Sequence, residues 1–324
     1  MIVKLIIGFL FSGIAIYLSL QNTDLSLFIQ ACSDVGLIFW LGVGGIFLLQ
    51  QLLRAFRQQR IIQTQVPDYS LFESHTLLCI SFLCINTFPI RLGEFARPIL
   101  LENQRKISFG SGIALVFLER MLDLFAAMVM ILLAISYASF SFGHDFAWFE
   151  QLQSLSRIGV WILGIVILGS IAFAKKIRQF APPFLHHFLD FLSQISTLRL
   201  LEIILSSIII WTMSCGMYIC AAIGFSVDGI GFFEGMGILS STMLGMAPPS
   251  APGFAGTYEA AFMVALYSFA TVEKEKALAM AIGFHVWVNF VQACTAICSL
   301  PYINLSLKDL TERIFDQLRR TSNK

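Results

Sequence analysis

The chain has 324 residues, of which 57% are hydrophobic and only 13% are charged, which excludes an ordinary soluble globular domain. Its formal net charge is +1, and its basic residues occur in short clusters between apolar runs, so no basic patch supports a nucleic-acid partner. The composition predicts an all-α polytopic membrane protein.

Membrane-spanning helices are predicted from about six apolar stretches, because a bilayer core takes about 20 helical residues. The first stretch ends near Leu20 without a small-residue cleavage site, so we expect a retained span rather than a signal peptide. Two further apolar stretches, 71–88 and 232–247, are cut short by Pro and Gly, which predicts re-entrant helical hairpins over about 71–104 and 232–269. The predicted full spans are approximately 2–20, 35–53, 112–137, 157–174, 200–225 and 277–302.

The distribution of Lys and Arg predicts the orientation, because basic residues favour the cytoplasmic side of a membrane. With the N-terminus inside and both hairpins leaving on the side they enter, most of the 21 basic residues are cytoplasmic. If 71–88 crossed the membrane fully, Arg91, Arg97, Arg105 and Lys106 would all move outside. We therefore predict re-entrant hairpins and cytoplasmic N- and C-termini.

The predicted elements repeat with inverted topology in residues 35–138 and 200–302. Inverted repeats with broken segments at matching positions are typical of transporters that bind their substrate near the membrane midplane. The alternative is that Pro and Gly simply mark ordinary loops. Both predicted hairpin tips place Pro and Gly ahead of a glutamate, with Pro89, Gly93 and Glu94 in the first and Pro252, Gly253, Gly256 and Glu259 in the second.

No soluble domain is evident, so residues 1–324 are expected to form a single integral membrane domain. The longest hydrophilic stretches are 54–70, 175–199 and 306–324, and the last two place apolar residues at helical spacing beside basic ones. Such amphipathic helices lie in the membrane interface. We predict that both segments are cytoplasmic interfacial anchors.

Charged residues beside the first predicted tip are the leading candidates for a site, because ionisable groups within a bilayer usually face a bundle interior, a cavity or a ligand. The guanidinium groups of Arg91 and Arg97 match the oxygens of a phosphate, although both could be snorkelling anchors. Glu119 and Asp123 share one helix face and need an arginine nearby, either Arg120 or one from the hairpin. These charges could equally be an ion network that pins the hairpin to this helix.

A polar stripe in the last predicted span consists of His285, Asn289 and Gln292 at helical spacing. A hydrogen-bonded seam between helices explains it most simply. His285 would titrate if it lined a cavity.

The sequence gives little support to an enzyme. It contains no G-x-S-x-G, H-E-x-x-H or Walker-type motif. Six of the seven cysteines lie within apolar segments, without the close His or Cys partners of a metal site. We therefore expect no cofactor, no metal and no ATP-driven step, so an ion gradient or the gradient of the lipid itself would drive any transport.

Three motifs together resemble the lysylphosphatidylglycerol synthase transmembrane region, also called the flippase-like domain family. They are Phe88–Arg97, Leu118–Asp123 and Ala251–Glu259, in the family's order and over nearly the whole chain. Members include the flippase portion of the multiple peptide resistance factor and proteins of hopanoid transport, which implies lipid translocation in a bacterial or archaeal cytoplasmic membrane. Phe254 departs from the family, where many relatives have a second glycine. The family's soluble aminoacyl-transferase domain is also missing, so we do not expect this chain to make lysyl-lipid.

The leading hypothesis is translocation of a phospholipid, a polyprenyl-linked lipid or another lipid across the membrane. One alternative is a non-catalytic membrane subunit that partners a lipid-modifying enzyme or a glycosyltransferase, and another is an intramembrane lipid transferase with Glu119 or Asp123 as base. Oligomeric state is open. The residues expected around the head-group path are Arg91, Glu94, Arg97, Glu119, Arg120, Asp123 and Glu259.

Overall fold

The computed structural model describes residues 2–88, 93–140, 151, 153–159, 161–162, 195–248, 250–303 and 306–322. These residues form helices joined by loops, with no strand among them. Three helical segments are long and apolar enough to cross a membrane: α3 (Leu37–Ile62), α10 (Thr197–Gly224), and α13 (Lys274–Ser299) with the short η3 turn (Leu300–Tyr302). The prediction of an all-α membrane protein is confirmed, whereas the number of spans stays a prediction.

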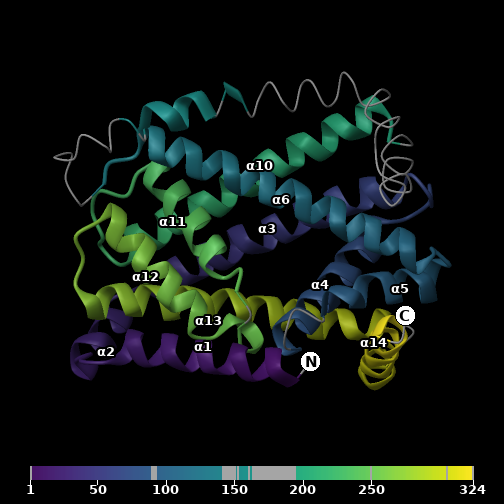
Figure 1. Cartoon of the computed structure of the whole chain (residues 1–324), viewed down its shortest axis with the longest axis horizontal. Coiled ribbons are helices and arrows are strands. Elements are labelled where there is room, and N and C mark those ends of the chain that lie inside the picture. The colour runs from purple at the N-terminus through teal and green to yellow at the C-terminus, as the bar shows by residue number, and fades with distance from the viewer. Residues whose placement is uncertain are drawn as a thin grey trace.

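Most of the predicted apolar stretches lie on helices, whose arrangement is shown in Figure 1. The predicted span 157–174 lies mostly outside the described residues, and so does most of the predicted amphipathic segment 175–199. The remaining helices are α1 (Ile2–Leu20), α2 (Leu25–Ser33), α4 (Leu71–Thr87), α5 (Ala96–Arg105), α6 (Phe109–Tyr137), α11 (Phe232–Gly245), the η2 turn (Pro252–Phe254), α12 (Thr257–Phe269) and α14 (Leu307–Ser322).

The main departure from the expected elements is α3, which continues well past the predicted end near residue 53 to Ile62. The extra turns are rich in Gln and Arg, which have high helix propensity, and Gly and Pro are absent until Pro67. The extension places Arg54, Arg57 and Arg60 on a packed helix rather than in a loop. It therefore brings basic residues into the protein interior.

The first hairpin consists of α4 and α5, which pack against each other. Ser70 and Glu73 start α4 with a reciprocal capping box, in which Ser70 Oγ accepts from the Glu73 N–H at 3.2 Å and a Glu73 carboxylate oxygen accepts from the Ser70 N–H at 2.9 Å. At the other end of α4, a Cβ on Gly93 would lie only 2.1 Å from Ile85 N. Glycine therefore allows the returning chain to touch the α4 backbone.

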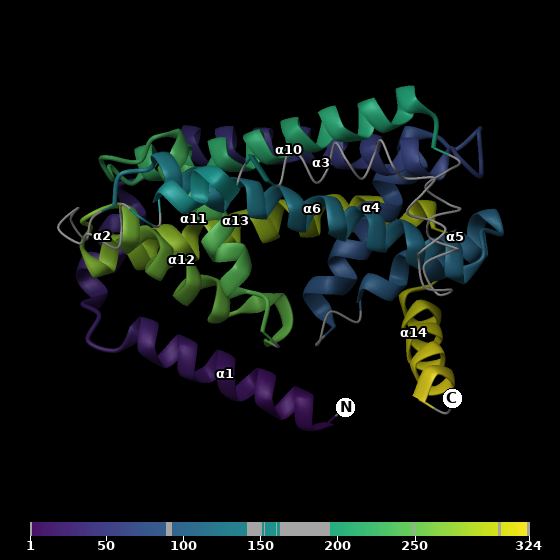
Figure 2. The ribbon, with the colours of Figure 1, turned by 45° about the horizontal axis from the view of Figure 1, so that its top comes forward.

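The second hairpin consists of α11 and α12, joined through the η2 turn. Gly256 has φ +82°, a left-handed conformation suited to glycine, and a Cβ there would lie 2.6 Å from Ser12 O of α1. Ser12 Oγ also accepts a hydrogen bond from Ala251 N at 2.8 Å. The tip of this hairpin is thus seated against α1, which lies along the outside of the bundle (Figure 2).

The packing of helices has a two-fold pattern. α3 packs on α10 at the centre, α4 packs on α3 and α13, and α11 packs on α10 and α6. The same contacts result when the helices of the two halves are exchanged, with α3 in place of α10, α4 of α11, α5 of α12 and α6 of α13. The two hairpins come together at their tips, where α4 contacts η2 (Figure 2). This pattern is what inverted repeats 35–138 and 200–302 would produce, although their orientation in a membrane stays a prediction.

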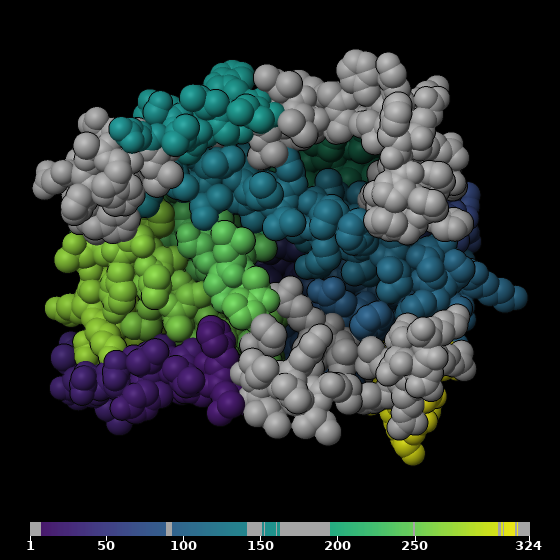
Figure 3. Space-filling view, viewed as in Figure 1, coloured from purple at the N-terminus to yellow at the C-terminus, as the bar shows by residue number. Residues whose placement is uncertain are grey.

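The described residues form two hydrophobic cores. One lies among α10, α11, α12 and α13, around Ile238, Phe262 and Leu266. The other surrounds the first hairpin and includes Leu310 and Ile314 of α14, both fully buried. The apolar side of α14 therefore packs against α5 and the protein interior, which differs from the expectation of a helix whose apolar side faces lipid. A space-filling view from the same direction as Figure 1 shows a hollow where the two halves meet (Figure 3).

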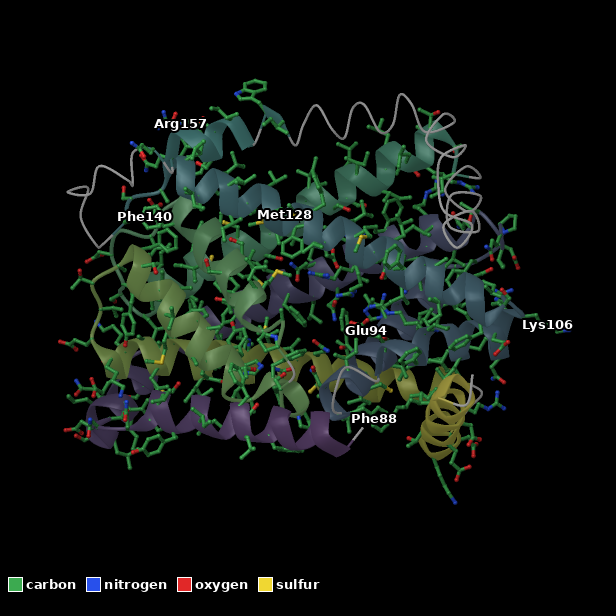
Figure 4. All side chains as sticks on the ribbon, viewed as in Figure 1. Phe88, Glu94, Lys106, Met128, Phe140 and Arg157 are labelled. Carbon is green, nitrogen blue, oxygen red and sulfur yellow. The ribbon has the colours of Figure 1, made fainter. Side chains whose placement is uncertain are left out.

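The orientation of the chain in the membrane can be tested by cysteine-accessibility labelling, in a variant from which the seven native cysteines have been removed. Lys106 follows the last residue of α5 in an exposed position at the outer edge of the molecule (Figure 4). Glu273 is exposed just before α13. A membrane-impermeant maleimide added to intact cells should label Glu273→Cys and leave Lys106→Cys unlabelled. Labelling of Lys106→Cys from outside would show that α4 crosses the membrane fully and would contradict the inverted repeats.

Candidate functional site

A buried ion pair links the first hairpin to α6. Arg97 lies in the first turn of α5 with 1% of its surface exposed, and its guanidinium pairs with the Glu119 carboxylate, itself 2% exposed. Arg97 Nε also donates to Ser81 Oγ of α4 at 3.0 Å, and its Cζ lies 5.5 Å from the centre of the Phe82 ring. One arginine thus joins α4, α5 and α6.

A second buried pair lies one turn further along α6. Asp123 Oδ1 accepts hydrogen bonds from both terminal nitrogens of Arg57, each at 3.1 Å. Arg57 Nη1 also donates to Ser207 Oγ of α10 at 3.1 Å. On the other carboxylate oxygen, Asp123 lies 3.7 Å from Arg120 Nη1. This group joins α3, α6 and α10 at the centre of the bundle.

Arginines outnumber carboxylates in this region, which we call the arginine cluster. Arg54 and Glu94 belong to it through electrostatic interactions, Arg54 with Asp123 and Glu94 with Arg97 and Arg120. Glu94 lies near the middle of the molecule, far from Lys106 at its edge (Figure 4). The cluster consists of four arginines (Arg54, Arg57, Arg97, Arg120) and three carboxylates (Glu94, Glu119, Asp123).

Unused hydrogen-bond donors accompany this excess of positive charge. The Nε groups of Arg57 and Arg120 are buried and have no hydrogen-bond partner among the described residues. Buried donors are normally satisfied, and a guanidinium donor left without a partner costs free energy. The Arg120 side chain is nevertheless 34% exposed, so part of it is reachable from outside. The cluster has both the charge and the free donors to bind an anion.

A separate polar group forms around the second hairpin tip, and we call Glu259 and His285 the tip pair. Glu259 Oε1 lies 2.6 Å from His285 Nδ1, and its Oε2 accepts from Gly256 N at 2.7 Å. The His285 ring stacks on Tyr258, with ring centres 4.1 Å apart. Glu259 therefore contacts α13 rather than the arginine cluster, and the candidate residues form two groups instead of the single path that we expected.

The polar stripe on α13 connects the two hairpins. Asn289 Nδ2 donates to the His285 carbonyl at 2.8 Å, and its Oδ1 accepts from Asn86 Nδ2 of α4 at 2.5 Å. The helix–helix seam expected from the sequence is therefore present. Beside it lies a cavity of about 270 Å³, lined by Leu83, Asn86, Gly253, Asn289, Gln292 and Ala293.

Some candidates fall outside these two groups. Arg91 and Pro89 lie outside the described residues, so their expected roles stay predictions. Pro252 and Gly253 form the η2 turn beside the cavity, Gly253 with φ +65°. Phe254 follows at φ +60°, a conformation that costs a non-glycine residue about 1–2 kcal/mol. This explains why glycine suits that position, and the Phe254 side chain packs against the neighbouring core.

Sequence reasoning missed Arg57 and Ser207. Arg57 looked like a cytoplasmic anchor in the orientation count, yet it is 2% exposed. The available signal was the helical spacing of Gln50, Arg54 and Arg57, which places polar groups on one side of a helix that would otherwise enter lipid. No group of three His, Cys, Asp or Glu side chains suited to a metal ion occurs among the described residues.

Comparison with known proteins supports the assignment of the chain as a membrane protein. The chain is similar to a protein named Glycosyltransferase AglD from Haloferax volcanii, with 23% identity over 357 residues. The match covers 96% of this chain and 56% of that relative, so the chain spans little more than half of its length. No solved structure matches the chain significantly. Residues 5–296 match the family described as the lysylphosphatidylglycerol synthase TM region, and the chain belongs to that family.

Proposed function

We propose that the chain moves a lipid with an anionic head group across a bacterial or archaeal cytoplasmic membrane. The arginine cluster is the observation that carries this proposal, because four arginines against three carboxylates leave a net positive charge inside a membrane protein. Ionisable groups are expensive there and usually mark a substrate path. The chain belongs to the lysylphosphatidylglycerol synthase TM region family, and the resemblance of its motifs to that family implies lipid translocation. Family membership therefore supports a lipid as the substrate.

The proposed mechanism is an exchange of anions on the arginines. Without lipid, Glu119 and Asp123 hold Arg97 and Arg57 in place, since a buried arginine without a counter-ion would cost several kcal/mol. A lipid phosphate offers the same planar match to a guanidinium. It would bind first to the exposed part of Arg120, and then compete with the carboxylates for the buried arginines. Phospholipids and polyprenyl-linked lipids share this phosphate.

Two alternatives remain from the sequence. The similarity to a longer protein named a glycosyltransferase favours a subunit that works beside such an enzyme. The transferase alternative is less favourable, because Glu119 and Asp123 are both engaged by arginines and would have to leave these ion pairs to act on a substrate. We retain translocation as the proposed function and the partner subunit as the second candidate.

Reconstitution separates these two functions. Purified protein in liposomes that contain fluorescent phosphatidylglycerol should make the inner-leaflet dye accessible to dithionite, faster than protein-free liposomes do. Fluorescent phosphatidylcholine, which has no net charge, should move more slowly. Movement that requires an added glycosyltransferase would favour the subunit, and absence of movement in both preparations would contradict translocation.

Substitution of Arg120 tests the role of the cluster. Arg120→Lys keeps the charge but loses the planar pair of donors, so phosphatidylglycerol movement should fall about 10-fold, and Arg120→Ala should fall further. Arg313→Lys is the matched control, because Arg313 is exposed on α14. Full movement by Arg120→Ala at normal protein abundance would show that Arg120 does not contact the head group.

A further inference from the structure

We propose that Glu259 and His285 form a proton-binding site that couples lipid movement to the proton gradient. The inference rests on the translocation proposed above and adds its source of energy. It concerns the tip pair, which belongs to a different group of side chains from the arginine cluster. The tip pair has no role in the exchange of anions that we propose for the arginine cluster. Three features carry the inference: the geometry of the pair, its position between the hairpins, and the cavity beside it.

The geometry fixes how the pair holds protons. Glu259 lies in the first turn of α12 and accepts the Gly256 N–H, an arrangement that favours the charged carboxylate at a helix N-terminus. An ionised carboxylate only accepts hydrogen bonds, so His285 Nδ1 must carry the hydrogen of their 2.6 Å contact. The other ring nitrogen, Nε2, then binds the transported proton.

Uptake of this proton changes the charge of the pair from −1 to 0. Both side chains are mostly buried, with 13% of Glu259 and 14% of His285 exposed. In such surroundings a net charge opposes movement of the tip through an apolar region, whereas a neutral ion pair does not. The negative pair also repels an anionic head group at the tips, and the neutral pair does not. Proton and anionic lipid should therefore bind with positive coupling, each raising the affinity for the other.

The position of the pair connects the proton to both hairpins. Glu259 begins the helix that follows the second tip, and the His285 carbonyl accepts from Asn289, which in turn accepts from Asn86 at the end of α4. Asn289 lies one helical turn from His285 and lines the 270 Å³ cavity with Gly253 of the second tip. Its polar lining side chains are Asn86, Asn289 and Gln292, which are the groups that a water beside the pair could bind.

Few other titratable groups face the pair. Among the described residues, α12 contributes Tyr258, whose hydroxyl lies 3.2 Å from that of Tyr218 of α10. α4 contributes the neutral Asn86, and α1 contributes Ser12 near Gly256. Tyrosines remain neutral through the range in which histidine titrates. The proposed proton is therefore assigned to Glu259 and His285 together, as one coupled pair.

Two measurements test this site. In proteoliposomes, an imposed pH gradient should accelerate phosphatidylglycerol movement by the wild type, and His285→Gln and Glu259→Gln should abolish the acceleration. His75→Gln is the matched control, a histidine on α4 whose ring lies near Cys79 and away from the tips. Independently of transport, NMR of ¹⁵N-histidine-labelled protein should show one of the five histidines titrating differently in Glu259→Gln, and His285→Gln identifies its signal.

The outcomes separate the two proposals. If the wild type moves lipid at the same rate with and without the pH gradient, the coupling is wrong, although the proposed translocation still holds. Absence of lipid movement under every condition would overturn translocation and the coupling with it. A His285 signal whose titration is the same in the wild type and in Glu259→Gln would also overturn the site, whatever the transport assay shows. Loss of gradient dependence in both glutamine variants, with His75→Gln unchanged, would support it.

Discussion

Replacing Arg97 with methionine should lower the free energy of unfolding by roughly 3–5 kcal/mol, the cost of breaking a buried ion pair by removing one partner. Glu119 would be left at 2% exposure without the guanidinium that balances it, and Ser81 would lose a donor. Unfolding in mixed detergent micelles, followed by circular dichroism, measures the change. Arg60→Met is the matched control, because Arg60 pairs with Glu202 at 25% and 28% exposure and such a pair contributes about 1 kcal/mol or less.

A double variant distinguishes a structural pair from a transport site. Arg97→Met combined with Glu119→Leu removes both charges, so the stability should return to within about 1.5 kcal/mol of the wild type. Phosphatidylglycerol movement should remain lost, because the arginine that exchanges its carboxylate for phosphate is gone. If the double variant moves lipid as the wild type does, the pair only pins the hairpin to α6.

Replacing Gly93 with alanine should prevent the first hairpin from closing. The added Cβ would lie 2.1 Å from Ile85 N and 2.2 Å from Cys84 C, and these are backbone atoms that no side-chain rotation can move. Either α4 and α5 separate at this point or the tip shifts, which we expect to cost at least about 3 kcal/mol. Reduced thermal stability in detergent and loss of lipid movement would both report the change.

The control for this substitution is a glycine within a helix that has free space. Nothing lies within 4 Å of a Cβ on Gly216 of α10, so Gly216→Ala should be neutral or stabilise the protein by up to about 1 kcal/mol through helix propensity. Equal stability of Gly93→Ala and Gly216→Ala would show that the close approach at Gly93 is absent in the membrane.

The elements of the fold were largely predictable from the sequence. Apolar runs and Pro/Gly breaks gave the helices of both hairpins, because length and hydropathy are local properties. The end of α3 was not predictable by the same rule. Arg54, Arg57 and Arg60 look like the cytoplasmic end of a span, and only the position of Asp123 on another helix shows that Arg57 belongs inside.

The candidate site was predictable in its residues but not in its pairing. Spacing along α6 indicated that Glu119 and Asp123 need arginines, and the sequence offered Arg97 and Arg120 among the possibilities. Which carboxylate takes which arginine depends on how α3, α5 and α6 meet, and a single sequence does not contain that information. The contact of Glu259 with His285, 26 residues apart, depends in the same way on α12 packing against α13.

The contact between Ser12 and Ala251 has a consequence for biogenesis. The two residues are 239 positions apart, so at roughly 5–20 residues per second the ribosome takes on the order of 10–50 s to make the partner of α1. If α1 is the membrane span that the sequence predicts, it must persist in the bilayer without α12 during that interval. Its large apolar side chains that remain exposed in the finished fold, Phe9, Leu10, Ile14 and Tyr17 among them, suit a helix that first exists alone among lipids and receives its neighbour late.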